Sequence, residues 1–197
     1  MAQSRMLSDM ADDTILHRLR KRLSAAPPPL RGGRPAAVVL PLMPVAGRWH
    51  FLFTVRPLSM PTHAGDVCFP GGGLRPGEDA LAAALREAQE EVGLAPEELT
   101  PLGFLPPQPT GSGHVIAPLL ALVTEGARPR PCPREVAEIF TAPLSHFLDP
   151  VHYAREKIVV RGQERAYWVV RWRNRRIWGA TAAMLKRLQE MATGDDE

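Results

Sequence analysis

Cysteine is scarce in this chain of 197 residues, which contains only two. Cys68 and Cys132 have no metal-binding spacing, and a single pair cannot form a disulfide scaffold. Long apolar runs are also absent, because none approaches the ~18 residues that a membrane-spanning helix needs. The first residues, MAQSRMLSDMADD, lack the apolar core of a secretory signal. We therefore expect a protein of the reducing cytoplasm that has no membrane partner.

Lysine is the second scarcity, because it occurs three times and leaves arginine to carry nearly all of the positive charge. The formal net charge is only +3 and the excess is dispersed, so nothing predicts nucleic-acid binding. The densest basic segment is Arg171–Arg176, which reads RWRNRR. We interpret it as a strand end and a hairpin turn with solvated arginines. The alternative is a phosphate contact, since the guanidinium fork fits phosphate.

The remaining composition is ordinary for a globular protein, with 45% hydrophobic and 23% charged residues. The length suits one domain with a full core. We expect residues 1–34 to hold an N-terminal helix and a Pro/Gly-rich linker. Residues 35–192 should form the folded domain, and residues 193–197 a frayed acidic tail. The sequence leaves open whether the N-terminal helix folds over the site or pairs subunits in a homodimer.

Apolar periodicity predicts strands mixed with a few helices, which indicates an α/β or α+β domain. Pro118 should mark an edge strand or a bulge. A Pro/Gly-rich loop is expected over Arg56–Gly73, and a loop of that length is usually functional. The predicted strands are Ala36–Leu42, Phe51–Val55, Leu99–Leu105 and Val115–Val123, followed by a hairpin of Lys157–Val160 and Arg165–Trp172. The predicted helices are Asp12–Ala25 and Thr181–Met191, besides one in the segment described next.

The segment Gly72–Leu94, GGLRPGEDALAAALREAQEEVGL, carries the strongest chemical signal. Glu87, Glu90 and Glu91 fall within an arc of roughly 100° on a helix, because each residue turns it by about 100°. Like charges at this spacing destabilise a helix, so a compensating charge is expected. A hard divalent cation such as Mg²⁺ binds through carboxylates and substrate phosphates. The alternative is a solvated acidic helix face.

The flanks of this segment favour a built site over a solvated face. Arg86 precedes Glu90 by one turn and can pair with it. Gly93 suits the left-handed position that follows a helix, and three glycines before the helix allow an unusual backbone path. Glu78 and Asp79 favour the positive end of the helix dipole. The predicted buried stripe of the helix consists of Leu81, Leu85, Ala88 and Val92.

These residues resemble the Nudix box, G-x5-E-x7-R-E-U-x-E-E-x-G-U, where U is apolar. Every fixed position is filled, with Ala88 a small choice at an apolar position. The matching residues are Gly72, Glu78, Arg86, Glu87, Ala88, Glu90, Glu91, Gly93 and Leu94. The resemblance implies an α/β fold, a Nudix-type α/β/α sandwich with a mixed β-sheet. It also implies a hydrolase that uses Mg²⁺ or Mn²⁺ and cleaves nucleoside diphosphates linked to another moiety.

The residues before the box are similar to those of the coenzyme A pyrophosphatase subgroup, whose pattern is roughly LLTxRS followed by HxGxVxFPGG. Later segments agree, namely EVAEIF before Pro143-Leu144 and the closing WGATA. This chain departs from the subgroup at two positions, where Pro57 replaces a usual serine and Asp66 a usual glutamine. Both put the substrate in question more than the chemistry. The matching residues are Thr54, Arg56, His63, Gly65, Val67, Phe69 and Pro70.

The resemblance implies a role for each candidate site residue. Glu87 and Glu91 are expected metal ligands, and Glu90 is either a third ligand or the catalytic base. Arg86 is grouped with the catalytic residues because it should orient Glu90. Glu135 is a candidate base from outside the box, with an exposed structural acid as the alternative. The substrate-binding group is Arg56, His63, Gly71 and Gly72, where Arg56 could instead form a buried ion pair and His63 could simply hold the loop.

Two rival functions stay open at this point. The first is a Nudix enzyme for ADP-ribose, NADH or another nucleoside diphosphate derivative, a small-molecule substrate like coenzyme A. The second is a non-catalytic ligand-binding module, which the three intact glutamates of the box disfavour. Cleavage of coenzyme A to 3′,5′-ADP and 4′-phosphopantetheine is the preferred interpretation.

Overall fold

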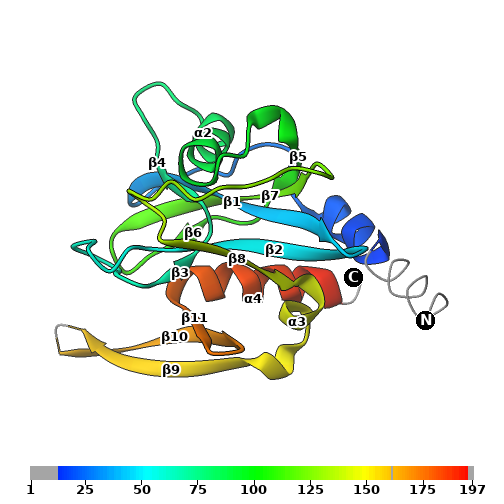
Figure 1. Ribbon diagram of the computed structural model, residues 1–197. Helices are drawn as coiled ribbons and strands as arrows, with labels where there is room; N and C mark the ends of the chain where they lie inside the picture. The colour runs from blue at the N-terminus through cyan, green and yellow to red at the C-terminus, as the bar shows by residue number, and fades with distance from the viewer. Residues whose placement is uncertain (1–12, 161, 195–197) are drawn as a thin grey trace.

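The computed structural model describes residues 13–160 and 162–194 and shows an α/β/α sandwich (Figure 1). Within these residues, eight strands form one mixed sheet, with β3-β2-β1-β7-β5 as its main path. Helix α2 covers one face, while α3 and α4 lie on the other. The predicted fold class is therefore confirmed. The strands are β1 (Arg34–Val45), β2 (Arg48–Val55), β3 (Val67–Cys68), β4 (Gly71–Gly73), β5 (Leu99–Phe104), β6 (Gln108–Pro109), β7 (His114–Val123) and β8 (Glu138–Pro143).

Strand β1 organises the sheet, because it pairs parallel to β7 and antiparallel to both β2 and β4. Its side chains alternate between the two faces with a period of two. Val38 and Leu40 enter the core under α4, whereas Ala37 and Val39 face α2. The helices are α2 (Ala80–Val92), α3 (Leu144–Leu148) and α4 (Gly179–Thr193), with short 3₁₀ turns η1 (Pro96–Glu98) and η2 (Pro150–His152).

The N-terminal helix occupies residues 13–22 and packs on the α4 face of the sheet. Leu19 is fully buried there, and the Arg18 Nη1 donates to the Ala192 carbonyl oxygen at 3.0 Å. The described part of this helix therefore lies on the face opposite α2. Residues 1–12 and 195–197, which include the predicted start of this helix and most of the acidic tail, lie outside the described residues.

Helix α2 presents a buried face that differs from the predicted stripe. Ala83, Ala84 and Ala88 are completely buried, whereas Leu81 and Leu85 are only partly covered. The predicted stripe is confirmed for Ala88 and Val92, whereas Leu81 and Leu85 pack only at the edge of the same cluster and alanines form the centre of the buried face. The small alanine side chains allow the helix to approach the sheet closely. Glu91 lies on the same side of the helix and is buried with them.

Two further sequence expectations need correction. The predicted long loop over Arg56–Gly73 contains β3, which pairs with β2, and β4, which pairs with β1. Pro118 does not mark an edge strand, because β7 lies between β1 and β5. It does lie at an irregularity of the pairing, since Phe104 pairs with Leu119 and Gln108 with Ile116, so that three residues oppose two. It sits where β5 ends and β6 begins, and its carbonyl oxygen accepts from Leu105 N–H at 2.9 Å. The nitrogen faces that same gap, so its missing proton removes no ladder bond.

A second sheet of three strands lies beyond α4 (Figure 1). Its strands are β9 (Tyr153–Val160), β10 (Gln163–Trp172) and β11 (Arg175–Trp178). The predicted hairpin is confirmed as β9 and β10, although both strands are longer than expected. Arg173 has a φ of 53° in the turn that leads into β11, which confirms the turn expected in this basic segment. Among the described residues, no helix is long and apolar enough to cross a membrane.

The alanine face of α2 gives a testable prediction. Replacing Ala84 by leucine should lower the free energy of unfolding by about 1–3 kcal/mol, because the site has no room for three more carbons. Chemical denaturation followed by circular dichroism measures this loss. The matched control is Ala82→Leu on the exposed face of the same helix, which should change stability by less than ~0.5 kcal/mol. Equal effects of the two substitutions would contradict the close packing.

Candidate metal centre

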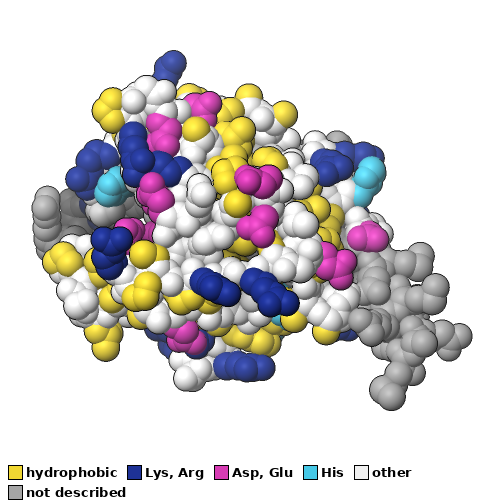
Figure 2. All heavy atoms as spheres, turned by 45° about the horizontal axis from the view of Figure 1, so that its top comes forward, with side chains coloured by type: hydrophobic (Ala, Val, Ile, Leu, Met, Phe, Trp, Pro, Cys, Tyr) yellow, Lys and Arg dark blue, Asp and Glu magenta, His cyan; other side chains and the backbone are white. Residues whose placement is uncertain are grey.

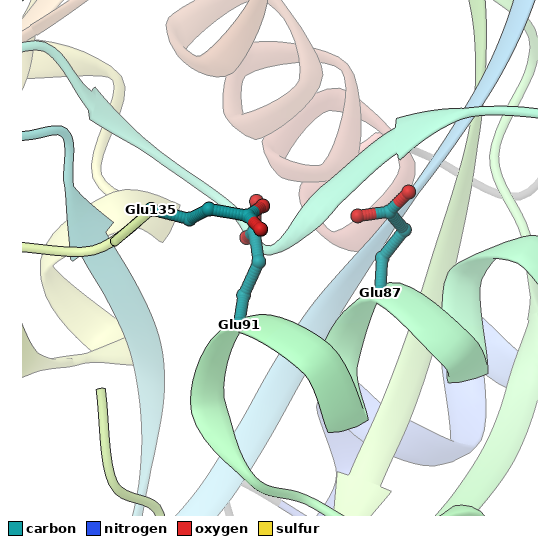
Figure 3. A group of neighbouring side chains, drawn as sticks. All are labelled: Glu87, Glu91 and Glu135. Atoms are coloured by element: carbon teal, nitrogen blue, oxygen red, sulfur yellow. The ribbon is translucent and has the colours of Figure 1, made fainter. Parts of the chain in front are cut away.

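Three carboxylates meet at one end of α2. Glu87 and Glu91 project from the helix one turn apart, and Glu135 reaches them from the segment before β8 (Figure 3). One oxygen of each lies within 4.8 Å of the others. Oxygen atoms at this spacing suit Mg²⁺ or a similar hard cation, which prefers carboxylate ligands. The structure thus brings together two predicted metal ligands and the predicted candidate base.

Glu91 is the most perturbed member of this cluster. Its side chain lies in the core interface with 6% of the residue exposed. Burial, followed by the negative charge of Glu87, raises the pKa of Glu91 to about 8. The Gly71 N–H donates to the Glu91 Oε2 at 3.3 Å and opposes this rise only in part. A buried carboxylate with a like charge beside it needs a cation, so the donor set fits a divalent metal ion.

The backbone of β4 passes close to these carboxylates, which explains two of its glycines. A Cβ on Gly72 would stand 2.5 Å from the Glu87 Oε1. A Cβ on Gly71 would collide with the Ala37 carbonyl oxygen in β1. Larger residues would therefore displace either the carboxylate or the sheet pairing. The role of these glycines in substrate binding stays a prediction.

Arg86 fixes the acidic side chains around the cluster. Its Nε and Nη2 donate to the two oxygens of Glu78 at 2.8 and 3.0 Å. Its Nη1 donates to the Glu87 Oε1 at 2.7 Å and to the Glu90 Oε2 at 3.0 Å. These hydrogen bonds from Arg86, with one from the Arg75 N–H, lower the pKa of Glu78 to about 2. Arg86 therefore holds three carboxylates at once and has little capacity left for a substrate.

Glu90 is not part of the three-carboxylate cluster. The Arg75 Nη2 donates to both of its oxygens, at 2.9 and 3.2 Å, and Arg86 binds it from the other side. Its side chain is 41% exposed, unlike that of Glu91. Its expected role as ligand or base stays a prediction that requires a side-chain rotation. Arg75 was missed by the sequence reasoning, because it occupies an unspecified position of the box.

Glu135 reaches the cluster through backbone hydrogen bonds of its own segment. The Cys132 N–H donates to the Glu91 carbonyl oxygen, and the Ala137 N–H donates to the Val55 carbonyl oxygen, both at 2.8 Å. These two hydrogen bonds fix the segment to the end of α2 on one side and to the end of β2 on the other. Glu135 itself is exposed, with its carboxyl group directed at Glu91 (Figure 3).

Arg56 stands at the end of β2, beside the cluster. Its positive charge acts on Glu91 and on Cys68. Its Nε is buried and has no hydrogen-bond partner, and its Nη2 contacts the Met60 sulfur at 3.5 Å. Among the described residues, no salt bridge to Arg56 is present, so the alternative of a buried ion pair finds no support. An unsatisfied guanidinium beside a carboxylate cluster has a donor available for a ligand.

His63 and Asp66 close the loop between β2 and β3. The His63 Nδ1 lies 2.8 Å from the Asp66 Oδ2, and the Trp178 Nε1 donates to the Asp66 Oδ1 at 2.9 Å. His63 adopts a left-handed backbone with φ of 58°. These contacts give His63 a loop-holding role in the structure, while contact with the substrate stays a prediction. Asp66 ties the loop to the start of α4.

Cys68 belongs to the packing around the site. Its sulfur lies 3.1 Å from the Thr54 Oγ1, and burial raises the pKa of its thiol to about 11. A thiol that stays protonated is a poor nucleophile.

On the face shown in Figure 2, acidic and basic side chains are interspersed rather than gathered by sign.

Comparisons with known proteins agree with this geometry. The NUDIX domain model matches residues 33–162. An uncharacterized Nudix hydrolase, NudL of Photorhabdus laumondii, is 35% identical over 175 residues, which cover 87% of this chain and 93% of the relative. The NudL protein of Escherichia coli is 34% identical over 158 residues, covering 79% of this chain and 81% of the relative.

Solved structures share the fold. The Nudix hydrolase RenU of M. smegmatis matches with a TM-score of 0.50 and 25% identity, covering 58% of this chain and 73% of that one. A MutT/nudix family protein from Enterococcus faecalis matches with a TM-score of 0.51 and 12% identity, covering 82% of this chain and 62% of that one. The fold, the site and these relatives define a hydrolase that acts on pyrophosphate bonds. The chain belongs to the Nudix family, whose members generally use divalent cations such as Mg²⁺ or Mn²⁺.

The buried charge of Glu91 predicts a pH-dependent stability. The pKa of this carboxyl group rises from an ordinary value of 4.5 to about 8 on folding. Between these values the folded protein holds a proton that the unfolded chain has lost, so stability falls as pH rises. In chelator at pH 8, the free energy of unfolding of Glu91→Gln should therefore exceed that of the unsubstituted protein by about 1–3 kcal/mol. The variant should accordingly unfold at a higher temperature.

Thermal unfolding with and without Mg²⁺ measures this effect. Added metal should stabilise the unsubstituted protein more than the Glu91→Gln variant, because binding to the folded state shifts unfolding by mass action. Glu125→Gln is the matched control, since this exposed acid lies outside the carboxylate cluster. A Glu91→Gln variant that is less stable than the unsubstituted protein in chelator at pH 8 would contradict the charge argument.

Proposed function

We propose that this Nudix hydrolase cleaves the pyrophosphate of coenzyme A to 3′,5′-ADP and 4′-phosphopantetheine. The observation that carries the proposal is the position of the loop that resembles the coenzyme A pyrophosphatase subgroup. Strands β3 and β4 hold its second half in the sheet, and Arg56 at its start acts on Glu91. The residues of the subgroup pattern are therefore adjacent to the carboxylate cluster, where a substrate would be held.

The carboxylates of the site have different proposed roles, which follow from their positions. Glu87 and Glu91 are the proposed ligands of Mg²⁺ or Mn²⁺, and Glu135, whose carboxylate lies beside theirs, is a candidate base. A divalent cation held there would neutralise phosphate charge and would lower the pKa of water. Arg86 acts as a positioning residue, because it fixes Glu87 and Glu90 through Nη1.

The reaction requires attack by water on a negatively charged diphosphate. The water oxygen forms a bond to one phosphorus, and the bond between that phosphorus and the bridging oxygen breaks. One proton of the water passes to a carboxylate, for which Glu90 and Glu135 are the two candidates, and the bridging oxygen leaves with the other phosphate. Arg56, with its unpartnered Nε, is the proposed donor to a phosphate oxygen.

The first alternative is a Nudix enzyme for ADP-ribose, NADH or another nucleoside diphosphate derivative. Pro57 and Asp66 keep it open, because they replace the serine and glutamine of the subgroup pattern. Both oxygens of Asp66 are engaged by His63 and Trp178, so this carboxylate serves the loop in the structure. A non-catalytic module is the remote alternative, which the complete set of box glutamates disfavours.

The substrate proposal is tested by direct competition. The purified protein with Mg²⁺, and separately with Mn²⁺, should hydrolyse coenzyme A with a higher kcat/KM than ADP-ribose or NADH. Chromatography of the products should show 3′,5′-ADP and 4′-phosphopantetheine in equal amounts. Faster turnover of ADP-ribose would refute the coenzyme A assignment while leaving the pyrophosphatase chemistry intact.

The carboxylate assignment is tested by substitution. Glu90→Gln and Glu91→Gln should each lower turnover by at least ~10², because each removes a charge that the reaction needs. Glu135→Gln should lower it by a smaller factor if Glu90 is the base, and by a similar one if Glu135 is. Binding of Mn²⁺, followed by electron paramagnetic resonance, should weaken in Glu91→Gln.

Glu125→Gln, a change of an exposed acid outside the site, is the matched control and should keep both activity and Mn²⁺ affinity. Circular dichroism should show that all of these variants retain the fold. Full activity in both Glu90→Gln and Glu91→Gln would remove the box helix from the catalytic site.

A further inference from the structure

A cavity of about 360 Å³ opens beside the loop that leads into the box. This volume lies near the lower end of the range for small-molecule sites, ~300–1,000 Å³. Three chain segments meet in it: the end of β2, the start of β3 and the β10–β11 turn with β11. Its lining residues are Val55, Gly65, Asp66, Val67, Asn174, Arg175, Arg176 and Trp178.

The cavity borders the carboxylate cluster. Val55 and Val67 form one of its walls and pair with each other across β2 and β3. Their chain neighbours are Arg56 and Cys68, whose side chains interact electrostatically with Glu91. The segment that carries Glu135 also hydrogen-bonds to the Val55 carbonyl oxygen. A molecule with its diphosphate at the cluster can therefore extend into this cavity.

Two arginines are fixed at the cavity by contacts that leave donors over. The Arg175 Nη2 donates to the Glu138 Oε1 at 2.6 Å, and its guanidinium lies over the Phe140 ring. The Arg176 Nη2 donates to the Glu156 Oε2 at 2.6 Å and contacts the Tyr167 hydroxyl at 2.9 Å. Each guanidinium has five N–H donors. Neither side chain is fully buried, with 26% and 33% exposed, so the remaining donors can reach a ligand.

The cavity lining offers both positive charge and an aromatic surface. Asp66, its one lining carboxylate, already accepts hydrogen bonds from Trp178 and interacts with His63. Glu138 and Glu156 are occupied by the two arginines. Trp178 supplies an aromatic wall, with Arg176 over its ring. Guanidinium groups held in place in advance suit a phosphomonoester, because the planar fork matches its oxygens.

We propose that this cavity binds the ribose phosphomonoester of the substrate, with Arg175 and Arg176 as its specificity-determining residues. The inference rests on the proposed function, since coenzyme A carries a phosphate at the ribose 3′ position in addition to its diphosphate. It extends that function, because it assigns the choice between nucleotides with and without this phosphate to β11. The basic segment then has a role in substrate choice, in addition to its place in a hairpin.

The test compares coenzyme A with dephospho-coenzyme A, which lacks only the ribose phosphate. In the unsubstituted protein, kcat/KM should be higher for coenzyme A. Arg175→Gln and Arg176→Gln should each lower kcat/KM for coenzyme A by about 10- to 100-fold, as expected when a hydrogen bond to a charged group is lost. The loss should lie mainly in KM, and the value for dephospho-coenzyme A should change less than about 3-fold. Arg173→Gln, which removes a charge from the same hairpin outside the cavity, is the matched control.

A second measurement needs no variant and so does not depend on whether a substituted protein folds. Calorimetry should show that the unsubstituted protein binds 3′,5′-ADP at least about 10-fold more tightly than 5′-AMP, which lacks the ribose phosphate. Equal affinities, or equal losses for both substrates in the arginine variants, would overturn the cavity proposal while coenzyme A hydrolysis stands. Absence of coenzyme A hydrolysis by the unsubstituted protein would overturn the proposed function, and this inference with it.

Discussion

The site depends on the close contact between α2 and the central sheet. Three completely buried alanines allow this helix to pack closely on the sheet, and Glu91 is buried in the same interface. A carboxylate placed there is costly, because burial and the charge of Glu87 both favour its protonated form. Arg86 relieves part of the repulsion by binding three neighbouring carboxylates, and its hydrogen bonds go to Glu78, Glu87 and Glu90 but not to Glu91. The negative charge that remains is the physical reason for a cation at this position.

Small residues on both sides make this arrangement geometrically feasible. Gly72 leaves room for the Glu87 carboxylate, and Gly71 lets β4 lie against β1 while its N–H reaches Glu91. The left-handed Gly93 ends the helix two residues after Glu91. The glycines and the buried charge therefore destabilise the fold locally, and the two apolar clusters on either face of the sheet offset this loss. Functional sites commonly show this division between a strained centre and a well-packed support.

How much of this could be predicted from sequence follows from the range of each interaction. The contact of Arg86 with Glu90 lies within one turn of one helix, so spacing alone indicates it. The approach of Glu135 to Glu91 depends on backbone hydrogen bonds from a segment more than forty residues later, which no local pattern encodes. The inner face of α2 was predicted only in part: Ala88 and Val92 are buried as expected, but Ala83 and Ala84 take central positions that hydrophobicity alone assigns to leucine. Arg75 left no signal at all, since its position in the box accepts any residue.

The two departures from the subgroup pattern gain meaning from the contacts of Asp66. A glutamine at this position could accept the indole N–H of Trp178, but it would place no negative charge beside His63. The carboxylate engages both partners and so ties the loop after β2 to the start of α4, across the mouth of the cavity. Its negative charge is thereby directed at protein donors instead of at a bound phosphate. The arginines of β11 face the same cavity, and they offset the charge that Asp66 adds. By the proposed assignment, substrate choice depends on two segments that are distant in sequence, the loop after β2 and strand β11. The loop pattern alone then does not determine the substrate.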